Sequence, residues 1–166
     1  GERQAQIITA KAGRFGKAIH GLCEGIALGK PVEISKQYQL QIDRFKEFLD
    51  RNVQEILYVE KTVYNNEIMV AGTIDLIYKH KDNSIRLLDI KTGTIKDTIR
   101  LQLAPYQNMA EKLLDIEIYQ REVLPLSRKG LTKKFKIIEY NNDSYLNDYE
   151  AFLGLLTYYR WKEKHD

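Results

Sequence analysis

The chain has 166 residues, of which 43% are hydrophobic and 30% are charged, and it carries a formal net charge of +3 at pH 7. This length is sufficient for one domain with a hydrophobic core and too short for two, so we expect a single domain over residues 1–166. The weakly basic balance permits binding to nucleic acid without demanding it.

Two helices and three strands are predicted in the first half of the chain. Apolar residues recur at helical spacing over Gly13–Leu28 and again over Ser35–Arg51. The period then changes, because the next three segments are rich in Ile, Val, Leu and Tyr and are separated by Asn or Asp turns. These segments predict a three-stranded meander over Glu55–Tyr64, Glu67–Lys79 and Ser84–Thr92.

The second half predicts two more helices around a strand pair. A helix capped by Asp97 or Thr98 runs to about Leu114, and strands follow at Glu117–Leu126 and Lys133–Tyr140. A last helix begins near Asp143, and we expect it to pack an apolar set consisting of Leu146, Phe152, Leu153, Leu156 and Tyr159. Alternating strands and helices predict an α/β fold with a central mixed sheet flanked by helices.

A charged pair occupies the third predicted strand. Asp89 and Lys91 are two residues apart in an apolar segment, so the period of two places both on one face and turns Ile90 toward a core. Burying a carboxylate and an ammonium is costly unless each finds a partner or a metal. This pair therefore indicates a functional site, with a plain surface ion pair as the alternative.

The turn before this strand decides whether Asp75 shares the site. A two-residue turn at Asp82–Asn83 would set Asp75 opposite Ile90, on the wrong face. A three-residue loop such as Lys81–Asn83, or a bulge, would set Asp75 opposite Asp89. A shared metal site requires one of these two arrangements.

Three short motifs occur in order: Gly72–Asp75, Asp89–Lys91 and Gln102–Tyr106. They resemble the Gly-x-x-Asp, Asp/Glu-x-Lys and Gln-x-x-x-Tyr signatures of the PD-(D/E)XK nuclease superfamily, and within it the RecB-like exonucleases. Upstream, His20 in the first helix and Glu60 in the first strand match further elements of that pattern. The resemblance implies a restriction-endonuclease-like core and a divalent-metal-dependent deoxyribonuclease that hydrolyses phosphodiester bonds.

The resemblance also implies roles for individual residues. Mg²⁺ or Mn²⁺ would be held by a ligand set comprising His20, Glu60, Asp75, Asp89 and the backbone carbonyl of Ile90. Oxygen ligands suit both cations, and the imidazole of His20 favours manganese-tolerant chemistry. Lys91 would act in catalysis by orienting or deprotonating water or by stabilising developing charge.

Gln102 and Tyr106, four apart on one helical face, would order Lys91, the attacking water or a phosphate as part of the catalytic set. An interior Pro105 predicts a kink in this helix, and a helix that instead begins near Pro105 would leave Gln102 in a loop. A purely structural role remains an alternative for each of these residues. His20 is then a satisfied core residue, Glu60 lies on an exposed strand rim, and Gln102 and Tyr106 serve only packing.

Basic residues near the site predict nucleic-acid contacts. Lys96 and Arg100 lie at the mouth of the expected site, where they are candidates for phosphate contact. A basic run around the predicted hairpin would either follow a phosphate backbone or protect an edge strand, and it consists of Arg128, Lys129, Lys133, Lys134 and Lys136. The partners expected are DNA ends or single strands, together with a helicase or recombination protein.

The cysteine content and the lack of a long apolar run restrict the kinds of site and the compartment that we expect. Cys23 is the single cysteine, which excludes an internal disulfide and a four-cysteine cluster in this chain. No apolar run approaches the roughly 20 residues that span a bilayer, and the first residues do not begin a signal peptide. We therefore expect a reducing compartment, such as the cytoplasm of a bacterium or of a phage-infected cell.

We predict an exonuclease in recombination, repair or phage DNA processing. The alternative is a catalytically silent protein of nuclease fold that binds nucleic acid or a partner.

Overall fold

A mixed sheet forms the centre of the computed structural model, which describes residues 6–7, 13–129, 131 and 134–165. Within these residues the sheet has six strands: β1 (Gln6–Ile7), β2 (Val53–Asn65), β3 (Val70–His80), β4 (Ile85–Lys91), β5 (Gln120–Pro125) and β6 (Ile138–Asn141). β2, β3 and β4 are successive antiparallel neighbours, so the predicted meander is confirmed. β4 then pairs in parallel with β5, β5 pairs antiparallel with β6, and β1 pairs in parallel with the start of β3.

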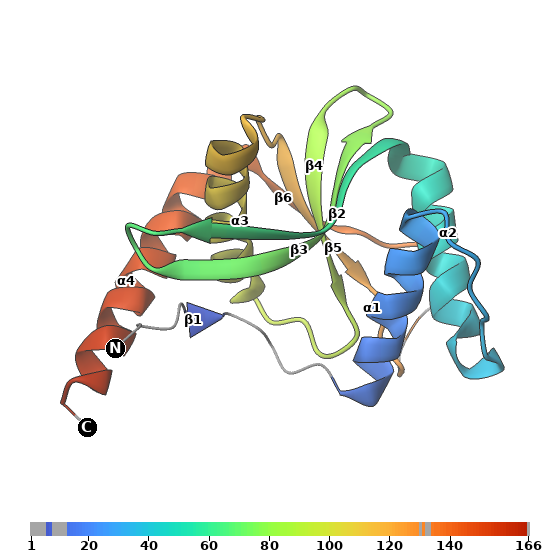
Figure 1. Ribbon diagram of the computed structural model, residues 1–166, viewed down its shortest axis with the longest axis horizontal. Helices are drawn as coiled ribbons and strands as arrows, with labels where there is room; N and C mark the ends of the chain where they lie inside the picture. The colour runs from blue at the N-terminus through green and yellow to red at the C-terminus, as the bar shows by residue number, and fades with distance from the viewer. Residues whose placement is uncertain (1–5, 8–12, 130, 132–133, 166) are drawn as a thin grey trace.

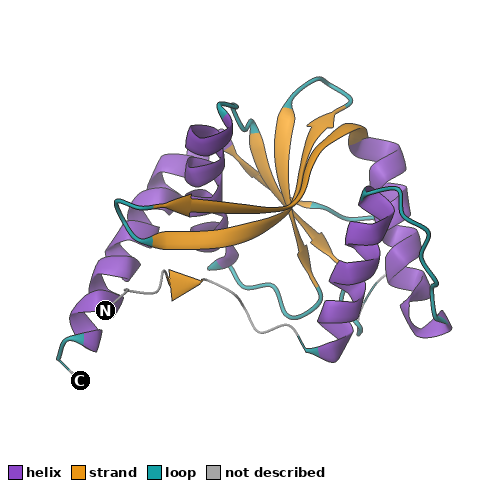
Figure 2. Ribbon diagram, viewed as in Figure 1, coloured by secondary structure: helices purple, strands orange, loops and turns teal. Residues whose placement is uncertain are grey.

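The longer helices lie on the two faces of this sheet (Figure 1). One face carries α1 (Arg14–Ala27) and α2 (Gln39–Asn52), the latter preceded by the short 3-10 turn η1 (Lys36–Tyr38). The other face carries α3 (Ile99–Leu114) and α4 (Tyr145–Glu163), with a second 3-10 turn, η2 (Asn142–Ser144), before α4. Figure 2 shows the resulting layers of helix, sheet and helix, which confirm the predicted α/β class.

Each face of the sheet has its own apolar core. Leu88 and Ile90 of β4 pack with the α1 and α2 side, whereas Leu87 packs with the α3 and α4 side. A strand covered on both faces needs apolar residues in both phases of its alternation, which explains the nearly continuous aliphatic run of β4. Asp89 and Lys91 are therefore exceptions in a strand that is otherwise mainly aliphatic and buried.

The turn between β3 and β4 has the length that a shared site requires. Lys79 pairs with Ile85, and the backbone N–H of His80 donates to the carbonyl of Ser84, so the loop consists of the three residues Lys81–Asn83. Asn83 has φ of 72°, a left-handed conformation that asparagine tolerates better than most residues. Of the two arrangements that would bring Asp75 to the site, a three-residue loop or a bulge, the structure has the loop.

One prediction about packing and one about the bounds of a strand are wrong. Phe152 of α4 is buried as expected, but Leu146 and Tyr159 are 66% and 50% exposed. The predicted strand Lys133–Tyr140 is shorter and lies later, at Ile138–Asn141, while Lys133 is outside the described residues. Pro105, by contrast, lies inside α3 and is buried, which excludes the alternative in which that helix begins near Pro105.

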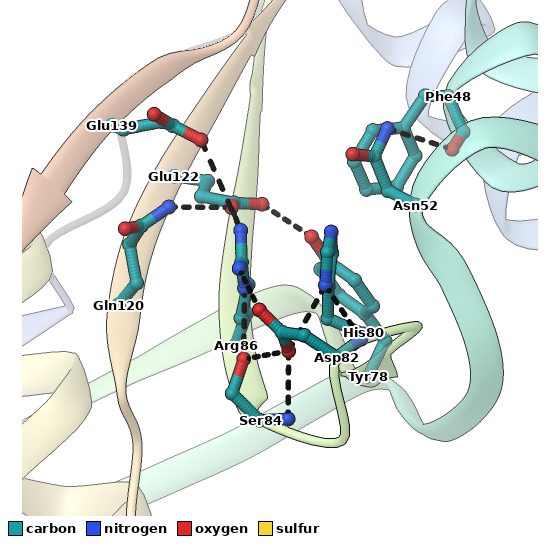
Figure 3. A network of polar contacts seen from close by, with 10 residues as sticks. All are labelled: Phe48, Asn52, Tyr78, His80, Asp82, Ser84, Arg86, Gln120, Glu122 and Glu139. Carbon is teal, nitrogen blue, oxygen red and sulfur yellow. Dashed lines mark hydrogen bonds and ion pairs between the residues drawn. The ribbon is translucent and has the colours of Figure 1, made fainter.

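A buried ionic network ties β3, β4 and β5 together near the β3–β4 turn (Figure 3). Glu122 is fully buried, and its carboxylate accepts hydrogen bonds from Arg86 Nη1 at 2.7 Å, Gln120 Nε2 at 2.8 Å and the hydroxyl of Tyr78. Arg86 reaches further to Asp82 in the turn, at 2.7 Å. The turn is thus anchored to the middle of the sheet, which helps to hold its length and register.

No helix in the described ranges combines the length and the apolar character that crossing a membrane requires.

Candidate metal-binding active site

Three side chains from three different elements converge where β3 and β4 begin to separate. His20 comes from α1, Glu60 from β2 and Asp75 from β3, and one ligand atom of each lies within 4.8 Å of the others. His20 Nδ1 is 3.0 Å from Asp75 Oδ1. A cation bound at about 2.0–2.2 Å accepts ligand atoms up to about 4.4 Å apart, so this donor set fits Mg²⁺ or Mn²⁺ after small movements.

Glu60 reaches this group through an unusual backbone conformation. Its neighbours Val59 and Lys61 pair with Leu76 and Ile74, which places Glu60 opposite Asp75. Glu60 has φ of 48°, a left-handed conformation that costs a non-glycine residue about 1–2 kcal/mol. Such strain gathers at functional sites, and here it coincides with a carboxylate of the ligand group.

Asp75 and Asp89 lie opposite each other by the register of β3 and β4. The β3–β4 ladder ends at the pair Leu76 and Leu88, and beyond this pair the strands separate. Asp75 Oδ2 occupies the gap and accepts a hydrogen bond of 2.6 Å from the backbone N–H of Ile90. Asp89 does not belong to the three-residue ligand group, but it borders the same cleft.

Asp89 and Lys91 share a face, as the sequence predicts. Lys91 Nζ lies 3.0 Å from Asp89 Oδ2, and Asp89 is only 5% exposed. That oxygen has no hydrogen bond of good geometry among the described residues. A buried carboxylate oxygen with spare capacity beside Asp75 is suited to a cation or to water bound by one.

The negative charge of the cluster changes the titration of its members. Burial, together with the charge of Asp75, raises the pKa of Asp89 to about 7 and that of Glu60 to about 7. The hydrogen bond to Asp75 raises the pKa of His20. Crowded carboxylates that retain protons near neutral pH are stabilised as anions when a divalent cation supplies the missing positive charge.

The Gln-x-x-x-Tyr motif connects Lys91 to the sheet. Gln102 Oε1 accepts a hydrogen bond from Lys91 Nζ at 3.4 Å, and Gln102 Nε2 donates to the hydroxyl of Tyr106 at 3.2 Å. Tyr106 is 2% exposed and lies directly over Gly72, where an added Cβ would be 2.3 Å from the ring. The glycine of one motif therefore makes room for the tyrosine of the other.

A cleft of about 840 Å³ opens above these groups. Lys96 lines it as predicted, whereas Arg100 does not, because Arg100 pairs with Asp148 at 3.1 Å. The cleft also contains Lys17 and Glu24, which the sequence analysis did not single out. Their positions three before and four after His20 place all three on one face of α1, a signal that was present in the sequence.

Comparison with known proteins supports the fold. No protein-family model matches the chain, and no curated protein matches it. Among solved structures it is similar to a protein described as a "Putative exonuclease" from Eubacterium rectale, with a TM-score of 0.53, 10% sequence identity and coverage of 89% of this chain. The chain spans 65% of the length of that protein. At this identity the likeness shows a shared α/β fold.

Proposed function

We propose that this protein is a divalent-metal-dependent nuclease that hydrolyses phosphodiester bonds. The observation that carries the proposal is the meeting of the His20, Glu60 and Asp75 ligand group with the Asp89 and Lys91 pair at one cleft. The fold shared with the protein described as a "Putative exonuclease" adds support.

The side chains divide into a ligand set and a water-handling set. Mg²⁺ or Mn²⁺, when bound, supplies a water that ionises near neutral pH and positive charge for the scissile phosphate. His20, Glu60 and Asp75 would hold the cation, with Asp89 and the carbonyl of Ile90 completing its surroundings. Lys91, kept in place by Asp89 and Gln102, would orient the attacking water or stabilise the charge that develops on the phosphate.

We extend the proposal to DNA as substrate and to exonuclease action at ends or on single strands. Recombination, repair and phage DNA processing are the settings that the RecB-like motifs favour, with unwinding supplied by a helicase partner. These finer assignments rest on the resemblance of Gly72–Asp75, Asp89–Lys91 and Gln102–Tyr106 to that family.

A cleavage assay tests the proposal directly. The protein is incubated with end-labelled linear and circular DNA, single- and double-stranded, with Mg²⁺ or Mn²⁺. We expect degradation of linear molecules, sparing of circles, and loss of all cleavage in Asp89→Asn. Asp97→Asn is the matched control, because Asp97 is exposed and is not among the residues that line the cleft. Absence of cleavage with either metal would favour the catalytically silent alternative.

Metal binding provides a readout that is independent of cleavage. A cation that binds only the folded state raises the thermal midpoint by mass action. We expect Mn²⁺ to raise the midpoint of the parent protein and to raise that of His20→Ala by less. Equal Mn²⁺ affinity in calorimetry for both proteins would identify His20 as a structural residue.

A further inference from the structure

The last helix, α4, lies at the outer edge of the molecule and has a second apolar face that is turned away from the sheet (Figure 1). Phe152 and Leu156 attach the helix to the core. Leu155, Tyr158 and Trp161 are instead 53%, 60% and 56% exposed, and none of them belongs to either core of the sheet. Neighbouring exposed aromatic side chains of this kind indicate a contact with another molecule.

The exposed residues of α4 recur with the spacing of a coiled-coil seam. Successive members of this row are alternately four and three residues apart, and all of them are exposed: Asn147, Ala151, Gly154, Tyr158, Trp161 and His165. An alternation of four and three keeps the row on one side of a helix over about five turns. The row is therefore suited to a second helix that lies along it.

Side-chain size changes along this row. Its first half is low, because Ala151 and Gly154 are small and a Cβ added to Gly154 meets nothing within 4 Å. Its second half is high, because the rings of Tyr158 and Trp161 stack with centroids 6.2 Å apart and Trp161 stacks on His165 at 4.7 Å. Rings that already support one another lose less freedom when a partner covers them.

A second copy of α4 in the antiparallel orientation has the complementary shape. A register that sets Tyr158 against Gly154 of the second copy also sets Trp161 against its Ala151, because both pairs are centred on residue 156. Each large ring then lies over a small residue, which gives close packing in every layer. A parallel pair would set Tyr158 against Tyr158 and Gly154 against Gly154, so that one layer is crowded and another is empty.

The charges beside the row match in the same arrangement. Glu150 and Lys164 are exposed and lie fourteen residues apart, which is nearly four turns, so they share one flank of the row. In the antiparallel pair, Glu150 comes within about 3 Å along the axis of the layer that contains Lys164 of the second copy, a distance that a lysine side chain spans. A two-fold axis makes this pair occur twice.

We propose that two copies of this chain associate through the exposed face of α4, antiparallel about a two-fold axis near residue 156. No residue of α4 lines the cleft that holds the carboxylates, so the association leaves both clefts open. This inference goes beyond the proposed nuclease function and does not depend on it.

The size of the face determines the strength to expect. The row is about 27 Å long, and a band about 10 Å wide along it covers roughly 300 Å² of each copy. A standard interface covers about 800 Å² of each partner, and smaller interfaces belong to weak complexes. We therefore expect a dissociation constant of about 10–100 μM.

Sedimentation velocity of the full chain tests the association. Between about 1 and 500 μM protein, the sedimentation coefficient should rise reversibly from that of a monomer toward that of a dimer. Trp161→Ala should raise the dissociation constant about tenfold or more. Tyr119→Ala is the matched control, because Tyr119 is also 56% exposed but lies outside α4. A parent protein that stays monomeric throughout, or a parental constant for Trp161→Ala, would overturn the proposal and leave this face to a different partner.

Charge reversal tests the antiparallel arrangement. Glu150→Lys or Lys164→Glu alone brings like charges together twice in each dimer and should weaken association about tenfold. The double variant restores both opposite-charge pairs and should return the dissociation constant to within about threefold of the parent. Lys46→Glu, exposed on α2, makes the same change in net charge as Lys164→Glu and should have no effect. A double variant as weak as either single variant would overturn the arrangement.

Discussion

Gly72→Ala should destabilise the protein through one identified contact. The new methyl group would lie 2.3 Å from Tyr106 Cε1 and 2.8 Å from Cζ, whereas ordinary contacts of this kind are 3.4–4 Å. The ring must therefore retreat by about 1 Å within a closely packed core. Overpacking of this size costs about 1–3 kcal/mol of unfolding free energy, and the better strand preference of alanine offsets at most about 1 kcal/mol of it.

Urea denaturation measures this loss. With a slope of about 2 kcal/mol per molar urea, a loss of 2 kcal/mol lowers the midpoint by about 1 M. Gly154→Ala is the matched control, because a Cβ on Gly154 of α4 meets nothing within 4 Å. In that variant stability should stay the same or increase, since alanine favours the helix by up to about 1 kcal/mol.

A double-mutant cycle isolates the contact with Tyr106. Tyr106→Leu removes the ring atoms that the methyl group meets, at the cost of lost packing in the same core. If the clash explains the loss, Gly72→Ala should be much less harmful in the Tyr106→Leu background, with a coupling of about 0.5–3 kcal/mol. Additive effects, or a parental midpoint for Gly72→Ala alone, would refute the reasoning.

Three further predictions concern the charged groups. Lys91→Ala should bind Mn²⁺ and DNA like the parent in calorimetry and anisotropy yet cleave about 100-fold more slowly, and a parallel loss of metal binding would assign Lys91 to holding the carboxylates. Because the pKa values of Asp89 and Glu60 are raised to about 7, stability gained by their protonation in the folded state is lost as pH rises through 7. The metal-free thermal midpoint should therefore fall from about pH 6 to about pH 8 while the increase caused by Mn²⁺ grows, and a pH-independent metal effect would contradict this. Arg86→Ala leaves the fully buried Glu122 without its cation and should cost about 3–5 kcal/mol in urea denaturation, whereas a loss below about 1 kcal/mol would mean that the network is not a stabilising unit.

The sequence was sufficient to predict which side chains of the site share a face, because side chains alternate strictly between the two faces of a strand. Asp89 and Lys91 had to share a face, and their side chains meet at 3.0 Å. The same periodicity, combined with the requirement that Asp75 join them, excludes a simple two-residue turn and leaves a three-residue loop or a bulge. Periodic structure carries such inferences because each residue has only two possible directions.

The cations of the cleft were harder to predict because loops and distant pairings decide their direction. Its position soon after Lys96 predicts that Arg100 lies at the mouth of the site, but Arg100 instead pairs with Asp148 of α4, 48 residues later. The left-handed backbone conformation of Glu60 could not be predicted either, because nothing in the neighbouring sequence indicates it. The exposure of Leu146 could not be predicted for a different reason. Apolar residues are distributed around the whole circumference of α4, so their spacing does not identify the face that packs on the core.

The length of the exposed three-residue turn between β3 and β4 determines whether Asp89 faces the candidate active site. Surface turns usually accept an added or deleted residue with little effect. Here a change of one residue between His80 and Ser84 would shift β4 by one step against β3 and move Asp89 to face a core, about 20 Å along the strands from the change at about 3.4 Å per residue. Any related chain with a different turn length at this point must carry a compensating bulge in β3 or β4, or it has given up the carboxylate pair.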